Sequence, residues 1–95
     1  MHYIYILHSP TKDKYYVGQT PDLETRLKFH NEISEKSYTS RYRPWEMKRV
    51  IEVSNRGQAV RIEKYIKGRK SRAYLQRLID DEQAVEKLKT EVNLV

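Results

Sequence analysis

The sequence predicts an α+β fold, in which helices pack against a small, mostly antiparallel sheet of three strands. Two runs rich in Tyr, Ile and Val, at residues 3–7 and 15–18, flank a polar segment of turn-forming residues, a pattern typical of a β-hairpin. Beyond residue 55, apolar residues recur three and four positions apart, which indicates amphipathic helices. A chain of 95 residues is long enough for one domain with a single core.

Three strands are expected, at residues 2–8, 14–19 and 45–53. Side chains alternate across a strand, so Ile4 and Ile6 share one face of the first strand and Tyr3 and Tyr5 share the other. The loop between the first two strands is too long for a two-residue turn. Packing of the two faces must therefore set the register of the hairpin.

Four helices are expected, at residues 21–31, 57–68, 71–79 and 82–91. Thr20 is the expected N-cap of the first helix, and Pro21 fits its first position. Gly68 is expected to end the second helix in the left-handed conformation, and Ser71 to cap the third helix.

We expect residues 1–80 to form the main domain and residues 81–95 to form a helical extension packed on it. The extension carries four acidic and two basic residues. Its negative charge favours packing on the domain, or on a second copy of the chain in a homodimer, over contact with nucleic acid.

The composition excludes several classes of protein. The chain has no cysteine, so it has neither disulfides nor thiolate metal sites. No apolar run approaches the ~20 residues that a membrane-spanning helix needs, and no charged-then-apolar leader opens the sequence. We therefore expect a cytoplasmic protein that makes no contact with a membrane.

The excess positive charge is concentrated in one segment. The formal net charge is +6 and the pI is near 9.6, which favours an anionic partner. Residues 61–77 carry seven basic groups and one acid, Glu63, so this segment alone accounts for the whole excess. Scattered solvated lysines would not give such a distribution, and we interpret the segment as a basic surface patch.

Three motifs resemble those of the GIY-YIG nuclease family. Residues 3–5 read Tyr-Ile-Tyr, ten residues follow, and residues 16–18 read Tyr-Val-Gly. Residues 23–31 read Leu-Glu-Thr-Arg-Leu-Lys-Phe-His-Asn, and residues 59–68 read Ala-Val-Arg-Ile-Glu-Lys-Tyr-Ile-Lys-Gly. The chain looks like a small stand-alone bacterial member, similar to the N-terminal nuclease module of the excision-repair endonuclease.

This resemblance implies the GIY-YIG endonuclease fold and a metal-dependent endonuclease that leaves 5'-phosphate and 3'-hydroxyl ends. Tyr5 is the implied general base and His30 the neighbour that offsets its proton, since a free phenol with a pKa near ~10 is mostly protonated at pH 7. Tyr16 positions the water or the phosphate, and Arg26 binds a non-bridging oxygen. Glu63 is the implied ligand of Mg²⁺ or Mn²⁺.

Three of these residues also have an ordinary structural interpretation. Arg26 suits a solvated helix charge, and His30 suits a residue near a helix end. Glu63 precedes Lys67 by four positions, a spacing that favours an ion pair on the surface of a helix. Without the resemblance, these structural interpretations are the better ones.

The expected partner is DNA, with RNA left open. Residues 37–45 interleave aromatic and basic groups, a mixture suited to nucleic-acid contact, although Tyr42 and Trp45 could equally cover the edge of the core. The residues expected to contact nucleic acid are Lys14, Arg41, Arg43, Lys67, Arg69, Lys70 and Arg72.

Branched or damaged DNA is the expected substrate, and a small basic domain is expected to need a protein partner or such a special structure. One alternative is a nucleic-acid-binding module of the same fold with weak or no activity. Another is an adaptor domain that acts through its acidic tail.

Overall fold

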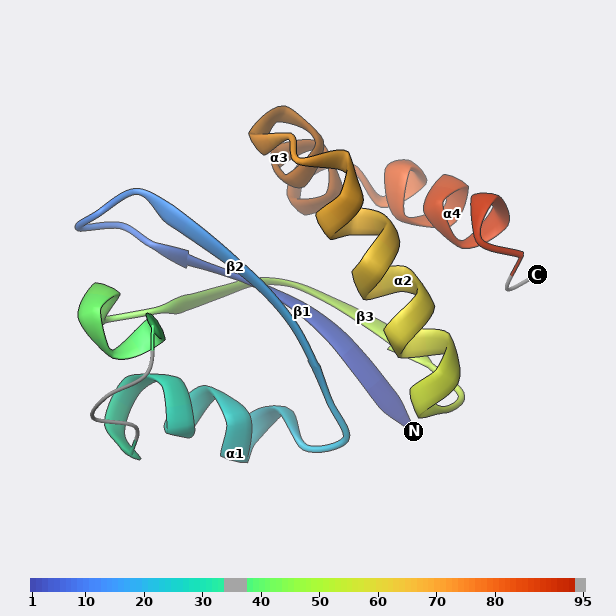
Figure 1. Ribbon diagram of the computed structural model, residues 1–95. Coiled ribbons are helices and arrows are strands. Elements are labelled where there is room, and N and C mark those ends of the chain that lie inside the picture. The colour runs from blue at the N-terminus through green and yellow to red at the C-terminus, as the bar shows by residue number, and fades with distance from the viewer. Residues whose placement is uncertain (34–37, 94–95) are drawn as a thin grey trace.

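A computed structural model describes residues 1–33 and 38–93 and has the predicted α+β architecture (Figure 1). Three strands form one sheet, namely β1 (His2–Ser9), β2 (Lys14–Thr20) and β3 (Glu46–Val53). The strand order is β2-β1-β3, and both pairs are antiparallel. The helices are α1 (Leu23–Lys28), α2 (Arg56–Arg69), α3 (Arg72–Asp80) and α4 (Glu82–Glu91). None of the helices in the described ranges is long and apolar enough to cross a membrane.

The central strand β1 contributes to a separate core on each face of the sheet. Ile4 and Ile6 belong to the larger core, which α2, α3 and α4 complete. Tyr5 and Leu7 point to the opposite face, where they pack with Trp45 and with the apolar side of α1. The predicted alternation along the first strand is confirmed, and Figure 1 shows α1 well apart from the group formed by α2, α3 and α4.

The first helix begins later than predicted. Thr20 is still paired with Tyr3 in the sheet, so it cannot serve as the N-cap. Asp22 has that role instead, because its carboxylate accepts a hydrogen bond from the backbone N–H of Thr25 at 3.1 Å. Pro21 therefore precedes the helix, and after Lys28 the chain continues as a π-helical segment, Phe29–Ile33.

The end of α2 also differs from the prediction. Gly68 lies inside the helix, and Lys70 is the residue in the left-handed conformation, with φ of 48°. Ser71 is the N-cap of α3, as predicted, and accepts from the backbone N–H of Tyr74 at 3.1 Å. An N-cap needs extended backbone, so the one residue between α2 and this cap must make the turn.

The C-terminal helix packs on the same core as the rest of the chain. Val85 and Leu88 of α4 belong to the cluster that contains Ile4 and Ile6. Arg49 of β3 fastens the junction between α3 and α4, because its guanidinium donates to the carbonyls of Leu78 and Ile79 and contacts Glu82. The division of the chain at residue 80 stays a prediction.

Candidate active site

Tyr5 lies in the middle of the sheet, and Gly18 leaves the space for its phenol. The two residues are cross-strand partners in β1 and β2. The absence of a side chain at Gly18 lets the Tyr5 ring cross over β2, which is an edge strand. Tyr5 is 2% exposed, and its hydroxyl lies 2.9 Å from Nε2 of His30.

His30 is held in place by the segments that surround it. Its Nδ1 atom lies 2.8 Å from the hydroxyl of Thr39, and its backbone carbonyl accepts from Nε of Arg43 at 2.7 Å. Trp45 in turn donates from its indole nitrogen to the carbonyl of Thr39 at 2.7 Å. His30 is 3% exposed, and each of its two ring nitrogen atoms has a buried hydrogen-bond partner.

The sequence reasoning missed two residues that build this environment. Thr39 orients the imidazole of His30, and no local pattern connects the two positions. Asn31 binds both the backbone N–H of Trp45, at 2.7 Å, and its carbonyl, at 3.1 Å. Asn31 ends the motif of residues 23–31, so the sequence contained the residue but gave no sign of its role.

Tyr16 is part of the same group of rings. Its ring centroid lies 4.9 Å from that of His30, in an edge-on arrangement, and 6.3 Å from that of Tyr5. The ammonium of Lys67 lies 5.8 Å from the Tyr16 centroid, which is within the range of a cation–π contact. The two predicted phenols therefore share one site.

Arg26 stands on the exposed side of this group. It lies on α1, and its guanidinium is 5.3 Å from the centroid of the Phe29 ring. Its positive charge acts on both buried groups, because it lowers the pKa of Tyr5 and also that of His30. Arg26 is therefore close to both of them while remaining accessible to a ligand.

Glu63 reaches the site from α2, which packs along β2. Its side chain is 19% exposed, and one carboxylate oxygen lies 3.2 Å from Nζ of Lys67. The predicted ion pair is thus present. The negative charge of Glu63 raises the pKa of Tyr5, so the carboxylate is also near the phenol that crosses β2. The alternatives of an ion pair and a site residue are both compatible with this position.

The protonation states follow from the buried location. Burial is the largest cause that raises the pKa of Tyr5, with further increases from Tyr16 and Glu63 and a decrease from Arg26. Burial, followed by the charges of Arg26 and Arg43, lowers the pKa of His30 from 6.5 to about 4. At pH 7 the site therefore contains a neutral phenol hydrogen-bonded to a neutral imidazole.

The family model for the GIY-YIG catalytic domain matches residues 1–77. The chain belongs to the GIY-YIG nuclease family. Comparison with curated proteins and with solved structures gave no match. The finer resemblance to the excision-repair endonuclease stays a prediction.

The carboxylate of Glu63, whose charge acts on Tyr5, is compatible with a divalent cation. The described residues contain no group of three or more His, Cys, Asp or Glu side chains that could hold a metal ion. Mg²⁺ does not need such a cage, because it commonly binds through one or two carboxylates together with waters and substrate phosphates. The partly exposed carboxylate of Glu63 suits this mode of binding, in a place that already holds the ammonium of Lys67.

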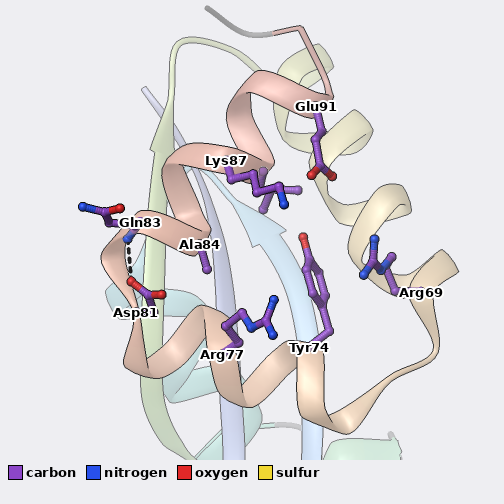
Figure 2. Close-up of a pocket in the computed structure, with 9 residues that line it drawn as sticks. Arg69, Tyr74, Arg77, Asp81, Gln83, Ala84, Lys87 and Glu91 are labelled. Atoms are coloured by element: carbon purple, nitrogen blue, oxygen red, sulfur yellow. Dashed lines mark hydrogen bonds between the residues drawn. The ribbon is translucent and has the colours of Figure 1, made fainter.

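Four of the residues predicted to contact nucleic acid line two hollows. Lys67, Lys70 and Arg72 line a hollow of about 320 Å³ between β2 and the junction of α2 and α3, which we call the basic hollow. Arg69 instead lines a hollow of about 330 Å³ between α3 and α4, where its guanidinium stacks on the ring of Tyr74 at 4.4 Å (Figure 2). The residues of the predicted patch therefore line two different hollows.

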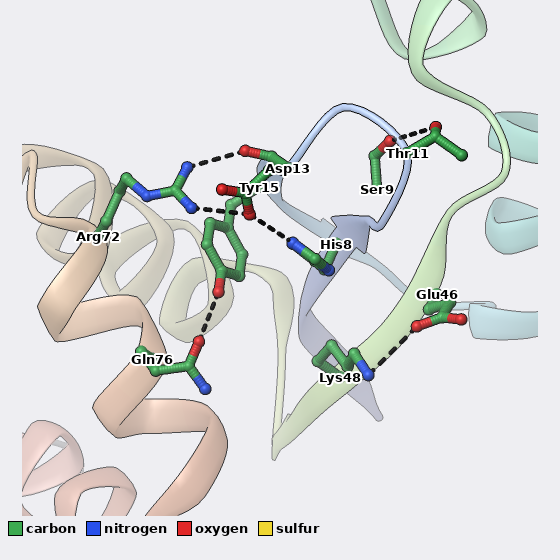
Figure 3. A network of polar contacts seen from close by, with 9 residues as sticks. All are labelled: His8, Ser9, Thr11, Asp13, Tyr15, Glu46, Lys48, Arg72 and Gln76. Carbon is green, nitrogen blue, oxygen red and sulfur yellow. Dashed lines mark hydrogen bonds and ion pairs between the residues drawn. The ribbon is translucent and has the colours of Figure 1, made fainter.

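Arg72 is engaged in the network that ties the hairpin loop to α3 (Figure 3). Its guanidinium binds both the carboxylate and the backbone carbonyl of Asp13, each at 2.9 Å. Asp13 also binds His8 at 2.9 Å, and Tyr15 donates to Gln76 at 2.5 Å. These contacts give Arg72 a structural role and partly offset its charge.

The other predicted nucleic-acid contacts are placed differently. Lys14 is exposed at the start of β2. Arg41 is exposed on the 3-10 helix Tyr38–Tyr42, whereas Arg43 is turned inward to bind the carbonyl of His30. Trp45 is buried in the smaller core, so it covers the core rather than presenting a stacking surface. Position 37, at the start of the aromatic and basic segment, lies outside the described residues.

Proposed function

We propose that this GIY-YIG domain is a metal-dependent endonuclease that hydrolyses phosphodiester bonds in DNA. The observation that carries the proposal is the buried hydrogen bond between the Tyr5 phenol and the His30 imidazole, with Arg26 and Glu63 close enough to act on it. Hydrolysis of this bond needs a group that accepts the proton of water and positive charge near the phosphate. The site offers both.

The neutral imidazole lets Tyr5 act without first becoming a phenolate. With its proton on Nδ1, His30 donates to Thr39 and leaves the lone pair of Nε2 for the hydroxyl of Tyr5. As water attacks phosphorus, the phenol oxygen takes the proton of water and passes its own proton to Nε2. No phenolate forms in this relay, so the raised pKa of Tyr5 does not prevent it, and the low pKa of His30 means that the imidazolium formed gives its proton up again readily.

The remaining residues bind and orient the phosphate. Arg26 is exposed and suited to a non-bridging oxygen, since its planar guanidinium matches the geometry of phosphate. Tyr16 lies on the same side as Tyr5 and orients the attacking water. Glu63 would hold Mg²⁺ or Mn²⁺, which when bound supplies charge stabilisation to the phosphate and to the departing 3'-oxygen. Cleavage of the bond between phosphorus and the 3'-oxygen leaves a 5'-phosphate and a 3'-hydroxyl.

The test is a cleavage assay with the purified chain, Mg²⁺ or Mn²⁺, and single-stranded, nicked and branched DNA. We expect the chain to cut DNA, and a chelator to abolish the cutting. Each of the variants Tyr5→Phe, Arg26→Ala and Glu63→Gln should cut much more slowly. Lys64→Ala is the matched control, because Lys64 is an exposed cation on the same helix as Glu63. Folded variants of the three site residues that cut as well as the unmodified chain would refute the proposal.

A second candidate is a nucleic-acid-binding module without activity. The ion pair between Glu63 and Lys67 favours it, because the carboxylate already has a cationic partner. This candidate predicts salt-sensitive DNA binding that survives in every variant, with no cutting of any substrate. Cutting that depends on Glu63 rules it out.

The substrate and the cellular setting are further parts of the proposal. We infer that branched or damaged DNA is cut, as expected for a chain similar to an excision-repair nuclease module. A domain of this size makes few phosphate contacts, so its affinity for DNA should be low and should fall steeply with salt. A protein partner or a second copy of the chain would raise that affinity, and the cytoplasmic location stays a prediction.

A further inference from the structure

The basic hollow combines an apolar floor with a cationic rim. Val17, Ile66 and Leu75 line its floor, together with Tyr15 and Tyr16. Lys67 and Lys70 line the same hollow. Phosphate alone would be bound as well by lysines on a flat polar surface. An apolar floor beside two cations instead suits a ligand with both a ring and a negative charge, which is the chemistry of a nucleotide.

The hollow adjoins the candidate active site directly. Tyr16 belongs to both, since it lines the hollow at the edge strand β2 and its ring packs edge-on against His30. Lys67 likewise lines the hollow while pairing with Glu63 at 3.2 Å. A nucleotide in the hollow therefore neighbours the phosphate that the site would cut.

We propose that the basic hollow binds an unpaired nucleobase of the DNA strand that is cut, next to the scissile phosphate. This inference rests on the proposed function and names its substrate class. A base within duplex DNA is stacked and paired, and bringing it into a protein pocket costs its unstacking. The hollow therefore selects single-stranded DNA, flaps or unpaired positions over intact duplex.

The rim consists of one residue with a free charge, Lys70, and two that are already paired, Lys67 with Glu63 and Arg72 with Asp13. Lys70 makes no ion pair with any residue in the described part of the chain and is exposed, so its charge is available to a phosphate. Arg72, also on the rim, is bound to Asp13. Its guanidinium packs on Tyr15, 4.9 Å from the ring centroid, so the two residues form one wall of the hollow. The walls are thus held in place while Lys70 remains free for the backbone of a ligand.

The test compares binding of two short oligonucleotides that carry the same charge, in chelator so that no cutting occurs. One is oligothymidylate, and the other is an abasic oligomer of equal length with the same sugar-phosphate backbone. A pocket for a base predicts that oligothymidylate binds about tenfold more tightly. Equal affinities of the two single strands for the unmodified chain would overturn the inference without the need for any variant.

Variants locate the effect in the hollow. Leu75→Gln makes the floor polar at nearly constant volume and should bring the ratio of the two affinities close to one. Ile79→Gln is the matched control, because Ile79 is also a half-buried residue of α3 packed against the same core, and it lies outside the hollow. Lys70→Asn removes the charge but tolerates the left-handed backbone, so it should weaken both affinities equally.

The inference fails if folded Leu75→Gln still binds oligothymidylate more tightly than the abasic oligomer by the same ratio as the unmodified chain. It also fails if Ile79→Gln lowers this ratio as much as Leu75→Gln does, or if Lys70→Asn leaves both affinities unchanged. These outcomes are independent of the proposed hydrolysis, since binding in chelator requires no catalysis. If the chain cuts duplex DNA as readily as single strands, only the proposed role of the hollow in binding a base is contradicted. A chain that binds bases but never cuts would contradict the proposed hydrolysis alone.

Discussion

Replacement of Gly18 by alanine should damage both stability and activity, because the phenol of Tyr5 occupies the space that a side chain would need. A Cβ atom built at Gly18 lies only 2.5 Å from Cζ of Tyr5 and 3.1 Å from Cε2 of Tyr16. Carbon atoms in favourable contact are ~3.5–4.0 Å apart, so the Tyr5 ring would have to move by about 1 Å. Gly18 does not use a positive φ angle, so the effect is purely steric.

The magnitude follows from the confinement of Tyr5. Its side chain is 2% exposed and hydrogen-bonded to His30, so it cannot swing into solvent. Overpacking typically costs about 1–3 kcal/mol, and the strained hydrogen bond adds about 0.5–1.5 kcal/mol. We expect a loss of about 2–4 kcal/mol in the free energy of unfolding, which lowers Tm by about 10–20 °C in a domain of this size. A displacement of about 1 Å should also reduce cleavage by about 100-fold.

Urea denaturation followed by circular dichroism measures the loss, and two further variants isolate its cause. Gly68→Ala is the matched control, because nothing lies within 4 Å of a Cβ atom placed at this position of α2, so it should stabilise the chain by about 0.5–1 kcal/mol. In a Tyr5→Leu background the colliding ring end is absent, and Gly18→Ala should then cost little. The reasoning is refuted if Gly18→Ala unfolds at the same urea concentration as the unmodified chain, or if its full cost persists in the Tyr5→Leu background.

Four further predictions concern the site and its support. Tyr5→Phe should lower the cleavage rate by about 10²–10⁴-fold and leave the affinity for DNA unchanged. A kinetic assay measures the first quantity and a binding assay the second. An unchanged rate would show that Tyr5 has no part in the proton relay. Because the pKa of His30 is lowered from 6.5 to about 4, the unfolded chain binds a proton more readily than the folded one, and stability should fall as pH decreases through that window. Urea midpoints should therefore fall less in His30→Gln than in the unmodified chain, and an equal fall would contradict this. Mg²⁺ should raise Tm of the unmodified chain but not of Glu63→Gln, and an equal rise in both would place the ion elsewhere. Asn31→Ala removes both hydrogen bonds to the Trp45 backbone and should lower the free energy of unfolding in urea by about 1–3 kcal/mol. Asn31→Asp keeps the acceptor for the Trp45 N–H and should lower it less. Equal losses in the two variants would argue against that hydrogen bond.

Local sequence patterns predicted the elements well and their ends less well. Alternation along residues 2–8 assigned Ile4 and Tyr5 to opposite faces, since the geometry of a strand leaves no other choice. The first helix was predicted to start at residue 21 because Thr20 is a good capping residue. Thr20 is instead held by pairing with β1, a contact between residues distant in the sequence that no local signal reveals.

The site shows the same division. The motifs named Tyr5, Tyr16, Arg26, His30 and Glu63, and these side chains lie together around the edge strand β2. The resemblance could not show what orients them, because Thr39 and Asn31 act through contacts with partners remote in the chain. The charge count of residues 61–77 could not show which of these charges are free, and Arg72 is bound to Asp13 across 59 positions.

The amino-acid sequence by itself determined the α+β class, the two faces of the sheet, the basic segment and the five candidate site residues. These depend on side-chain period, composition and short motifs, all of which are local. Tertiary structure decided which charges are neutralised, which imidazole nitrogen faces the phenol, and that a hollow with an apolar floor adjoins the site. Those properties arise where α1, α2 and β2 meet, because burial and partner identity exist only after distant segments have packed together.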